Sequence, residues 1–237
     1  MGKSAYKRIL LKVSGEVLAG DQSFGIKPEF LDAMARQIVE AAHTGVQIAI
    51  VIGAGNIFRG VAVAARGADQ VTADMMGMLG TVINSLALGD AIGRMGVPVK
   101  VYTSVPMPTI ADTFTARDAT LALDQGFVIV CAGGTGNPFF TTDTAAALKA
   151  IELRCDVLLK GTKVDGVYSE DPKKNPAAKR YDTIGYEEVI ARNLKVMDTA
   201  AFALARDNGL PILVYALGDE GGLMGVLDGR TRSTRVG

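Results

Sequence analysis

The stretch from Ala132 to Thr144, read A-G-G-T-G-N-P-F-F-T-T-D-T, combines residue types that can bind an anion. It follows the apolar run Phe127 to Cys131, which predicts a buried strand, and it precedes the helical pattern Ala145 to Arg154. Three glycines allow a tight turn with exposed N–H groups: Gly133, Gly134 and Gly136. Thr142 or Asp143 can cap the helix. This order predicts a phosphate site, although an ordinary tight connection could have the same sequence.

Cations accompany the ends of other predicted strands. Lys12 lies in the apolar stretch R-I-L-L-K-V, and Lys160 ends the stretch D-V-L-L-K. Arg59 follows V-Q-I-A-I-V-I and its glycine turn G-A-G-N. A lysine at a strand end can also simply extend its ammonium group into water. The three cations therefore indicate a binding site only when they are considered together.

Transfer of a phosphoryl group is the chemistry that these residues could perform together. The side chains expected at the strand ends are Lys12, Arg59, Asp74, Asp143 and Lys160. They would bind a polyanion without a histidine base. Phosphoryl transfer depends on in-line placement and charge neutralisation more than on covalent chemistry. The acceptor would then already be an anion, either a phosphate or a carboxylate.

Several common catalytic motifs are absent from the sequence. There is no G-x-x-x-x-G-K-[ST] loop and no G-x-S-x-G at Ser14, and Phe58 stands where a dinucleotide-binding fingerprint needs its third glycine. The single histidine, His43, ends a predicted helix, and Cys131 and Cys155 lack C-x-x-C spacing. These observations argue against a zinc site and against Ser-His or Cys-His catalysis, and both thiols are expected to be buried and reduced.

Alternating strands and helices must position these residues. Helices are predicted from Pro28 to the stop at Gly45, and at Thr72 to Met95, Thr115 to Asp124 and Thr199 to Asn208. Further strands are predicted at Val99 to Thr103 and Pro211 to Leu217. This order predicts an α/β fold, with a mostly parallel sheet covered by helices on both faces. Ligands of such folds bind outside the carboxyl ends of the strands.

The composition favours one globular domain. The 237 residues contain no proline-rich or low-complexity linker, and 25 basic residues balance 25 acidic ones. No overall positive field would attract nucleic acid or an anionic membrane. We find no N-terminal signal and no apolar run of transmembrane length, which predicts a cytoplasmic protein.

Seven motifs, in order along nearly the whole chain, resemble those of the bacterial uridylate (UMP) kinases of the amino acid kinase family. They are K-R-I-L-L-K-V-S-G-E from Lys7, F-G-I from Phe24, V-I-G-A-G-N-I-F-R-G from Val51, D-M-M-G-M-L-G-T-V-I-N from Asp74, G-T-G-N-P-F-F-T-T-D from Gly134, K-V-D-G-V-Y-S-E-D-P from Lys163 and K-V-M-D from Lys195. The fifth motif is highly specific. The resemblance implies an acceptor part at about 1–155 and an ATP-binding part at about 156–237 of a single domain.

The resemblance also implies site residues for ATP and UMP. Those for ATP are Lys12, Val13, Ser14, Gly15, Gly55, Arg59, Thr162, Tyr168 and Asp171. Those for UMP are Ala54, Asp74, Thr135, Gly136, Asn137, Pro138, Phe139, Phe140, Thr141 and Thr142. Lys12, Arg59, Asp143 and Lys160 would be catalytic. Asp74, read as a first-turn carboxylate, could accept hydrogen bonds from ribose, whereas Phe139 and Phe140 could either contact the base or belong to the core.

Regulation and assembly are implied in the same way. Mg²⁺ would arrive with ATP, without dedicated protein ligands. GTP would activate through the loop Gly20, Asp21, Gln22, Ser23, Phe24 and Gly25, although a plain exposed connection is the alternative, and UTP would oppose it. A homohexamer is implied, with part of the Met75 to Met95 helix at a subunit contact.

Two departures from the resembled pattern are visible, Ala54 in place of a third glycine and Gly161 in place of alanine. Two rival functions remain open. One is a related kinase that phosphorylates a carboxylate or carbamate, such as acetylglutamate. The other is a catalytically silent nucleotide- or oxyanion-binding relative.

Overall fold

The structure is a computed structural model of residues 1–237 that describes all of them except 1–4, 59–66, 68, 173, 195 and 219–221. Within the described residues the strands form one nine-stranded sheet in the order β4-β3-β5-β2-β1-β6-β8-β9-β7. The strands are β1 (Arg8–Val13), β2 (Gln47–Ile52), β3 (Val99–Thr103), β4 (Asp112–Thr113), β5 (Val128–Ala132), β6 (Val157–Thr162), β7 (Thr183–Ile184), β8 (Ile212–Ala216) and β9 (Ser233–Val236). All paired strands run parallel except β8 and β9. This confirms the predicted mostly parallel sheet.

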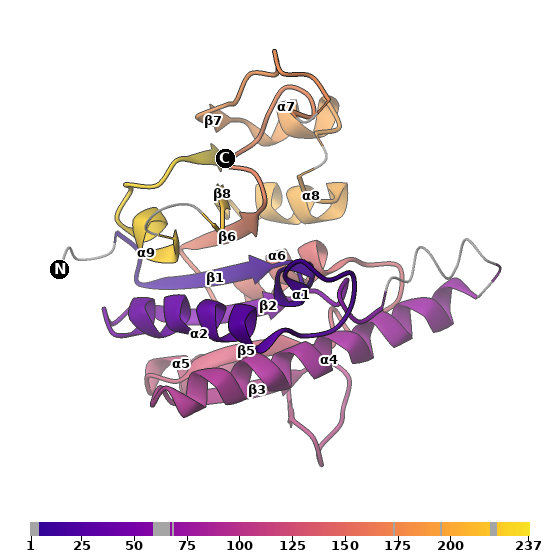
Figure 1. Ribbon diagram of the computed structural model, residues 1–237, viewed down its shortest axis with the longest axis vertical. Coiled ribbons are helices and arrows are strands. Elements are labelled where there is room, and N and C mark those ends of the chain that lie inside the picture. Colours follow the sequence, from indigo (N-terminus) through magenta and orange to yellow (C-terminus); the bar gives the residue numbers. More distant parts are fainter. Residues whose placement is uncertain (1–4, 59–66, 68, 173, 195, 219–221) are drawn as a thin grey trace.

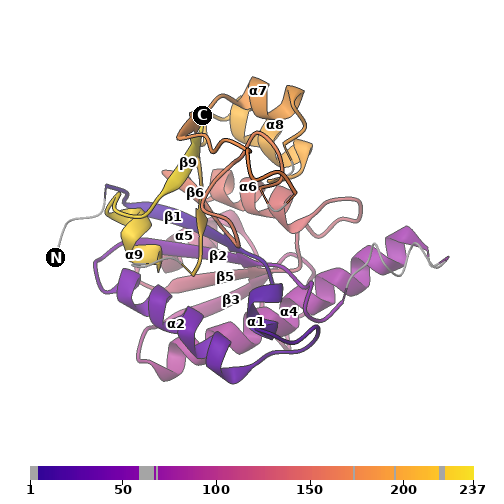
Figure 2. The same cartoon turned by 45° about the horizontal axis from the view of Figure 1, so that its top comes forward.

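Helices cover both faces of the sheet (Figures 1 and 2). They are α1 (Glu16–Ala19), α2 (Pro28–Ala42), α4 (Gln70–Arg94), α5 (Ala116–Asp124), α6 (Thr142–Glu152), α7 (Tyr186–Ala191), α8 (Thr199–Asp207) and α9 (Gly222–Leu227). One core lies between the sheet and α1, α2, α4 and α9, and a second between the sheet and α5 to α8. Apolar strands buried on both faces, such as β1, are what this layering requires.

The predicted elements match the observed ones closely. The strands at Arg8 to Val13 and Val99 to Thr103 are confirmed residue for residue, and Pro28 stands at the first turn of α2 as predicted. The sequence reading missed α1, a single turn directly after β1. It did not predict β4, β7, α7, α9 or β9 either. It also placed Asp74 in the first turn of its helix, whereas α4 begins at Gln70 and is capped by Asp69. Asp74 therefore lies one turn further into the helix.

The long helix α4 corrects a second expectation. By length and composition alone it could cross a membrane, so the reading that no run has that length is wrong. More than half of its most apolar 18-residue stretch, 56%, is buried inside the fold, and core helices of soluble proteins share this length and composition. Leu88 and Ile92 on its inner side are fully buried against the sheet.

The turn with the three glycines and the turns after the three strands that precede or carry the cations lie together at the carboxyl ends of the central strands. They follow β5, β2, β1 and β6, which are consecutive in the centre of the sheet. Because these strands are parallel, their carboxyl ends open on the same side. The topology thus brings together segments that lie more than a hundred residues apart in the chain.

Candidate active site

Two lysines and one aspartate form a compact cluster at these carboxyl ends. Lys12 on β1 and Lys160 on β6 are direct neighbours in the parallel register. Asp143 lies in the first turn of α6, and its Oδ1 is 2.7 Å from the Nζ of Lys12 and also accepts a hydrogen bond from the Nζ of Lys160. The three side chains are only 7%, 10% and 15% exposed. The structure therefore places three of the four residues that the sequence suggested for catalysis in direct contact.

The cluster carries an excess of positive charge. Burial opposes ionisation of Asp143, but the ammonium groups of Lys12 and Lys160 outweigh this effect and lower the pKa of the carboxyl below its ordinary value. Burial lowers the pKa of Lys160 to about 8, with Lys12 adding to the decrease and Asp143 opposing it. With Asp143 ionised and both lysines protonated, the cluster has a net charge of one positive unit. It is suited to receive an anion that restores the balance.

The start of α6 is fixed by hydroxyl groups. Thr141, not Thr142 or Asp143 as predicted, is the N-cap, and its Oγ1 accepts a hydrogen bond from the N–H of Asp143 at 3.0 Å. The N-cap sits one residue earlier because the helix begins at Thr142 itself. Asp198, the N-cap of α8, in turn accepts hydrogen bonds from the hydroxyls of Thr141 and Thr144. Asp143 is thus held in place from a second helix.

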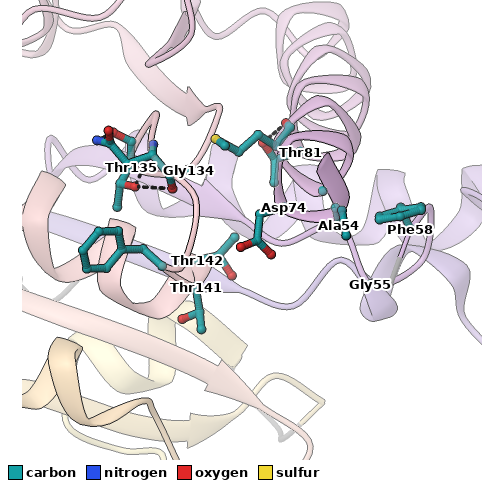
Figure 3. Close-up of a pocket in the computed structure, with 14 residues that line it drawn as sticks. Ala54, Gly55, Phe58, Asp74, Thr81, Gly134, Thr135, Thr141 and Thr142 are labelled. Carbon is teal, nitrogen blue, oxygen red and sulfur yellow. Dashed lines mark hydrogen bonds between the residues drawn. The ribbon is translucent and has the colours of Figure 1, made fainter. Parts of the chain in front are cut away.

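A cleft of about 190 Å³ opens beside the cluster. It lies between α4, the turn after β2 and the loop before α6, and Asp74 extends from α4 toward Thr141 and Thr142 (Figure 3). Seven residues assigned to UMP line it: Ala54, Asp74, Thr135, Asn137, Phe140, Thr141 and Thr142. Gly136, Pro138 and Phe139 belong to the same loop but do not line the cleft. The structure therefore brings most of the proposed acceptor residues around one space.

The glycine-rich loop has the backbone that its sequence indicated. Gly133, Gly134 and Gly136 all have positive φ, which confirms the predicted tight turn. Phe139 and Phe140 are 71% and 52% exposed, so the alternative that they belong to the core is wrong. Phe139 also has a positive φ of 69°, and its N–H donates to Oδ2 of Asp74 at 2.8 Å. Asp74 therefore fixes the loop across the cleft.

A second cavity, of about 440 Å³, lies between β6, β8 and α1. Its lining includes Thr162, Glu16 and Gly20. Gly55 connects it with the first cleft: Gly55 lines that cleft, and a Cβ at Gly55 would stand 3.2 Å from Cγ of Glu16. The cluster is next to both cavities in the chain: Thr142 of the first cleft directly precedes Asp143, and Thr162 of the second cavity follows Lys160 by two residues. Two cavities arranged in this way could hold a donor and an acceptor of the same phosphoryl group.

The two cysteines take no part in this site. Cys131 is buried and Cys155 half-buried, so the expectation of burial is wrong for the second, and both are free thiols. Burial raises the pKa of each to about 12, which leaves them protonated at neutral pH. Neither is suited to act as a nucleophile.

Comparison with known proteins agrees with this geometry. The sequence profile of the amino acid kinase family matches residues 7–216. The chain belongs to the amino acid kinase family. The uridylate kinase of Brucella anthropi is 56% identical over 235 residues, which cover 99% of this chain and 98% of the relative.

Solved structures of the family have the same fold. The UMP kinase of Bacillus anthracis superposes with a TM-score of 0.93 at 38% identity, covering 98% of this chain and 96% of that one. The UMP kinase of Ureaplasma parvum gives a TM-score of 0.92 at 34% identity, with coverage of 100% and 99%. The similarity thus extends over nearly the whole chain.

The other described residues that the family resemblance assigns to ATP lie in β1, in the turn after β1 and in the segment after β6. Val13 is a buried strand residue, and Ser14 and Gly15 form the turn that follows it. Tyr168 and Asp171 are not among the residues that line the two cavities, and the hydroxyl of Tyr168 donates to Asp165 at 2.6 Å. Arg59 lies outside the described residues, so its predicted role stays a prediction.

The loop from Gly20 to Gly25 lies beside the second cavity. Gly20 lines that cavity, Asp21 forms an ion pair with Lys27, and Phe24 is exposed. The loop is tied back to the turn after β2 by a hydrogen bond from the N–H of Gly25 to the carbonyl of Asn56 at 2.8 Å. It is therefore an anchored segment next to the proposed donor side.

Sequence reasoning missed two residues that accept hydrogen bonds from the site loops, Asp198 and Thr81. Asp198 appeared only as the last letter of the K-V-M-D motif, with no role attached. Thr81 on α4 was not singled out, yet its Oγ1 accepts the N–H of Gly133 at 2.8 Å. The available signal was a polar residue on the inner side of an otherwise apolar helix, since such a residue needs a hydrogen-bond partner.

Proposed function

We propose that this protein is a UMP kinase, which transfers the γ-phosphoryl group of ATP to UMP and so produces UDP for pyrimidine nucleotide synthesis in the cytoplasm. The observation that carries the proposal is the buried cluster of Lys12, Asp143 and Lys160, whose chain neighbours Thr142 and Thr162 each line one of the two cavities. The choice of acceptor is supported by the uridylate kinase of Brucella anthropi, which this chain matches over 98% of that protein's length.

The chemistry follows from the charges. The phosphate of UMP, with a second pKa near 6, is largely a dianion at neutral pH and can attack without a general base. One of its oxygens bonds to the γ-phosphorus while the bond to the bridging oxygen breaks, and ADP leaves with the electron pair. Lys12 and Lys160 stabilise the charge on the transferring group, and Asp143 holds both ammonium groups in position.

Magnesium fits this site as a companion of ATP. Among the described residues no three His, Cys, Asp or Glu side chains converge as a metal site, and Asp143 is the carboxylate in the cluster. Mg²⁺ commonly binds through one or two carboxylates together with substrate phosphates. When bound, it would neutralise charge on the β- and γ-phosphates. Asp143 would orient the lysines or the metal.

A coupled assay of ADP release tests the reaction and its acceptor. UMP, CMP, dUMP and acetylglutamate are supplied in parallel with MgATP. UMP is expected to be turned over fastest, because residues that the family resemblance assigns to UMP, among them Asp74, Thr135 and Asn137, line the acceptor cleft. Equal rates with CMP and UMP would contradict the specificity, a preference for acetylglutamate would favour a carboxylate kinase, and no turnover at all would favour a silent relative.

Regulation by nucleotides is a further part of the proposal. GTP would activate through the loop Gly20 to Gly25, and UTP would oppose it by occupying the UMP site. Coupling of this kind is typically worth about 1–3 kcal/mol, which is enough to shift a UMP saturation curve clearly. The test is a UMP titration with and without GTP, on the wild type and on a variant with the loop replaced. The assignment fails if GTP leaves the wild-type curve unmoved, or moves that of the loop variant equally.

A homohexamer completes the proposal. It is supported by an apolar stripe on the outer face of α4, where Met75, Leu79 and Ile83 are exposed in the single chain. Large apolar side chains that are exposed along one face of a helix are typical of a subunit contact.

A further inference from the structure

Two buried asparagines form a hydrogen-bonded pair next to the turns that follow β1 and β2. Asn56, in the turn after β2, and Asn84, on the inner side of α4, are 1% and 0% exposed. The Nδ2 of Asn84 donates to Oδ1 of Asn56 at 2.7 Å, and the Nδ2 of Asn56 donates to Oδ1 of Asn84 at 3.0 Å. Buried amides are costly unless fully hydrogen-bonded, so a reciprocal pair in this position calls for a reason.

Each amide uses its second hydrogen to hold a backbone segment. Asn84 donates to the carbonyl of Gly53 at 2.7 Å, and Asn56 donates to the carbonyl of Gly25 at 2.9 Å. The N–H of Gly25 returns to the carbonyl of Asn56, so Gly25 is bound through both of its backbone groups. All four amide hydrogens of the pair are therefore engaged.

The turn after β1 packs directly on this pair. A Cβ at Gly15 would stand 2.2 Å from the carbonyl oxygen of Gly53, 2.4 Å from Oδ1 of Asn56 and 2.8 Å from Nδ2 of Asn84. No side chain fits there, which explains why the position needs glycine. Gly15 lies three residues after Lys12 and two residues after the end of β1. The position of the donor-side turn is thus set by contact with the two amides.

Besides the contact of Asn84 with Gly53, helix α4 approaches the turn after β2 closely at a second point. A Cβ at Gly80 would stand 2.9 Å from Cβ of Ala54, and Thr81 beside it binds Gly133. Asn84 therefore lies on a helix that contacts the turns after both β2 and β5. The pair connects the donor turn, the acceptor turn and the loop that ends at Gly25.

We infer that Asn84, acting through Asn56, is a positioning residue for phosphoryl transfer, which sets the spacing between the turn at Gly15 and the turn at Gly53. The inference rests on the proposed kinase function. In-line transfer depends on the separation of donor and acceptor, and a misplacement of about 1 Å can reduce the rate by about 100-fold. Neither Asn56 nor Asn84 lines either of the two cavities, so we expect loss of the pair to affect the rate more than nucleotide binding.

The kinetic test compares Asn84→Ala and Asn56→Ala with Ser85→Ala. Ser85 is the neighbour of Asn84 on α4, is equally buried, and its Oγ has no hydrogen-bond partner in the part of the chain that the structure describes, so it is a matched control. We expect each asparagine variant to lower kcat by at least about 10-fold, with the Kd values of MgATP and UMP within about three-fold of wild type. Ser85→Ala should stay within about two-fold in kcat.

The double variant and hydrogen exchange separate positioning from a merely structural role. The double variant should lose about as much kcat as the worse single variant, because either change breaks the same pair. Amide exchange at Gly25 should accelerate in both single variants and not in Ser85→Ala. If Asn84→Ala proves too unstable, Asn56→Ala breaks the pair from the other side and leaves the bond of Asn84 to Gly53.

The inference is overturned if kcat per folded molecule is unchanged, or if only the Kd values rise. It is also overturned if exchange at Gly25 is unaffected. Should the wild type fail to phosphorylate UMP, the proposed function falls, and exchange at Gly25 then decides alone whether the pair holds the turns.

Discussion

Lys12 is one of two ammonium groups that share the carboxylate of Asp143, and it is the one on the strand that leads into the Ser14-Gly15 turn. Substitution Lys12→Met keeps a similar length and apolar stem and removes the charge. We expect kcat to fall by two or more orders of magnitude, since such a group contributes roughly 3 kcal/mol to charge stabilisation in the transition state. Steady-state kinetics with UMP and MgATP would measure it.

Lys149 provides the matched control for Lys12→Met. It is an equally buried lysine, but its Nζ contacts Oε2 of Glu152 at 3.0 Å and lies 3.5 Å from the ring centroid of Phe114, away from both cavities. Lys149→Met should lower the free energy of unfolding and leave kcat close to wild type. A normal kcat with only a raised KM in Lys12→Met would mean that Lys12 serves binding alone.

Lys160 should give the enzyme an alkaline limit. Its pKa is lowered to about 8 by burial, so as the pH rises through that value the free enzyme loses the ammonium group that would meet the donor phosphates. We expect kcat/KM for MgATP to fall above pH about 8, and kcat to fall only at higher pH, because bound phosphates favour the charged amine. A pH profile from 6 to 10 measures both.

The pH dependence of stability has the opposite sign to that of activity. The folded pKa of Lys160 lies below the ordinary value of about 10.4, so between these two values the unfolded chain binds more protons. The contribution of Lys160 to stability therefore increases as the pH rises through this window, while activity declines. Lys160→Arg, which stays charged, should remove the alkaline fall in kcat/KM. A kcat/KM that stays constant up to pH 9.5 in the wild type would contradict the assignment.

The sequence revealed these charged residues but not their contacts. Lys12 and Lys160 could be suspected because a cation inside an apolar strand is unusual, and the parallel register then makes them neighbours. The sharing of Asp143 depends on how α6 begins, and the residue that caps this helix was assigned wrongly, since Thr141 and not Thr142 or Asp143 is the N-cap. Asn84 and Asp198 could not be assigned at all, since their partners, Gly53 and Thr144, come from distant parts of the chain.

At the scale of elements, Asp198 links the start of α8 to the start of α6. It accepts the N–H of Ala201 at 2.8 Å and the hydroxyls of Thr141 and Thr144. We expect Asp198→Ala to lower the free energy of unfolding by about 1–2 kcal/mol through loss of the cap. It should also lower kcat, because the first turn of α6 carries Asp143. Urea unfolding and steady-state kinetics on the same preparations would measure the two effects.

The N-cap of α5, Thr115, provides a control that separates the loss of stability from the loss of kcat. Thr115 caps α5 by accepting the N–H of Asp118 at 3.1 Å, and α5 lies away from the cluster. Thr115→Ala should cost a similar amount of stability and leave kcat unchanged. If Asp198→Ala loses stability but keeps its kcat, the link from α8 does not help to position Asp143.

The longer elements could be predicted well because their signals are local, whereas α7, α9 and β9, with four to six residues each, were not predicted. Buried parallel strands are continuous apolar runs, and glycine, proline and capping residues mark where helices begin and end. The single turn α1 escaped because four residues are too few for a periodic pattern. The short edge strands β4 and β7, with two residues each, escaped for the same reason.

At the scale of the whole molecule, strand order was the information that the sequence lacked. The chain places β6 between β1 and β8, and this brings Lys160 next to Lys12 across an interval of almost 150 residues. Alternating strands and helices predict parallel pairing but leave many orders open. The family resemblance implied what the residue patterns could not, namely UMP as the acceptor and which residues would bind ATP and which UMP. These site assignments stay predictions.

The outer face of α4 presents apolar side chains along one stripe, while the opposite side of the helix is buried against the sheet. The stripe consists of Met75, Met76, Leu79, Ile83 and Leu86, which are between 38% and 52% exposed. We expect light scattering to find the wild type larger than a monomer at micromolar concentration. Burying a single leucine or isoleucine stabilises by about 1.5–3 kcal/mol, and a charge in its place adds a desolvation cost.

Ile83→Glu should therefore weaken association by about 100-fold or more and shift the scattering mass toward smaller species. Leu121→Glu on α5 is the control, since Leu121 is 49% exposed but does not belong to the stripe. A monomeric wild type, or a Leu121→Glu variant that dissociates as readily as Ile83→Glu, would show that this face of α4 is not the subunit contact. Because Asp74, Thr81 and Asn84 extend from the other side of the same helix to the acceptor cleft and its turns, dissociation should also lower kcat.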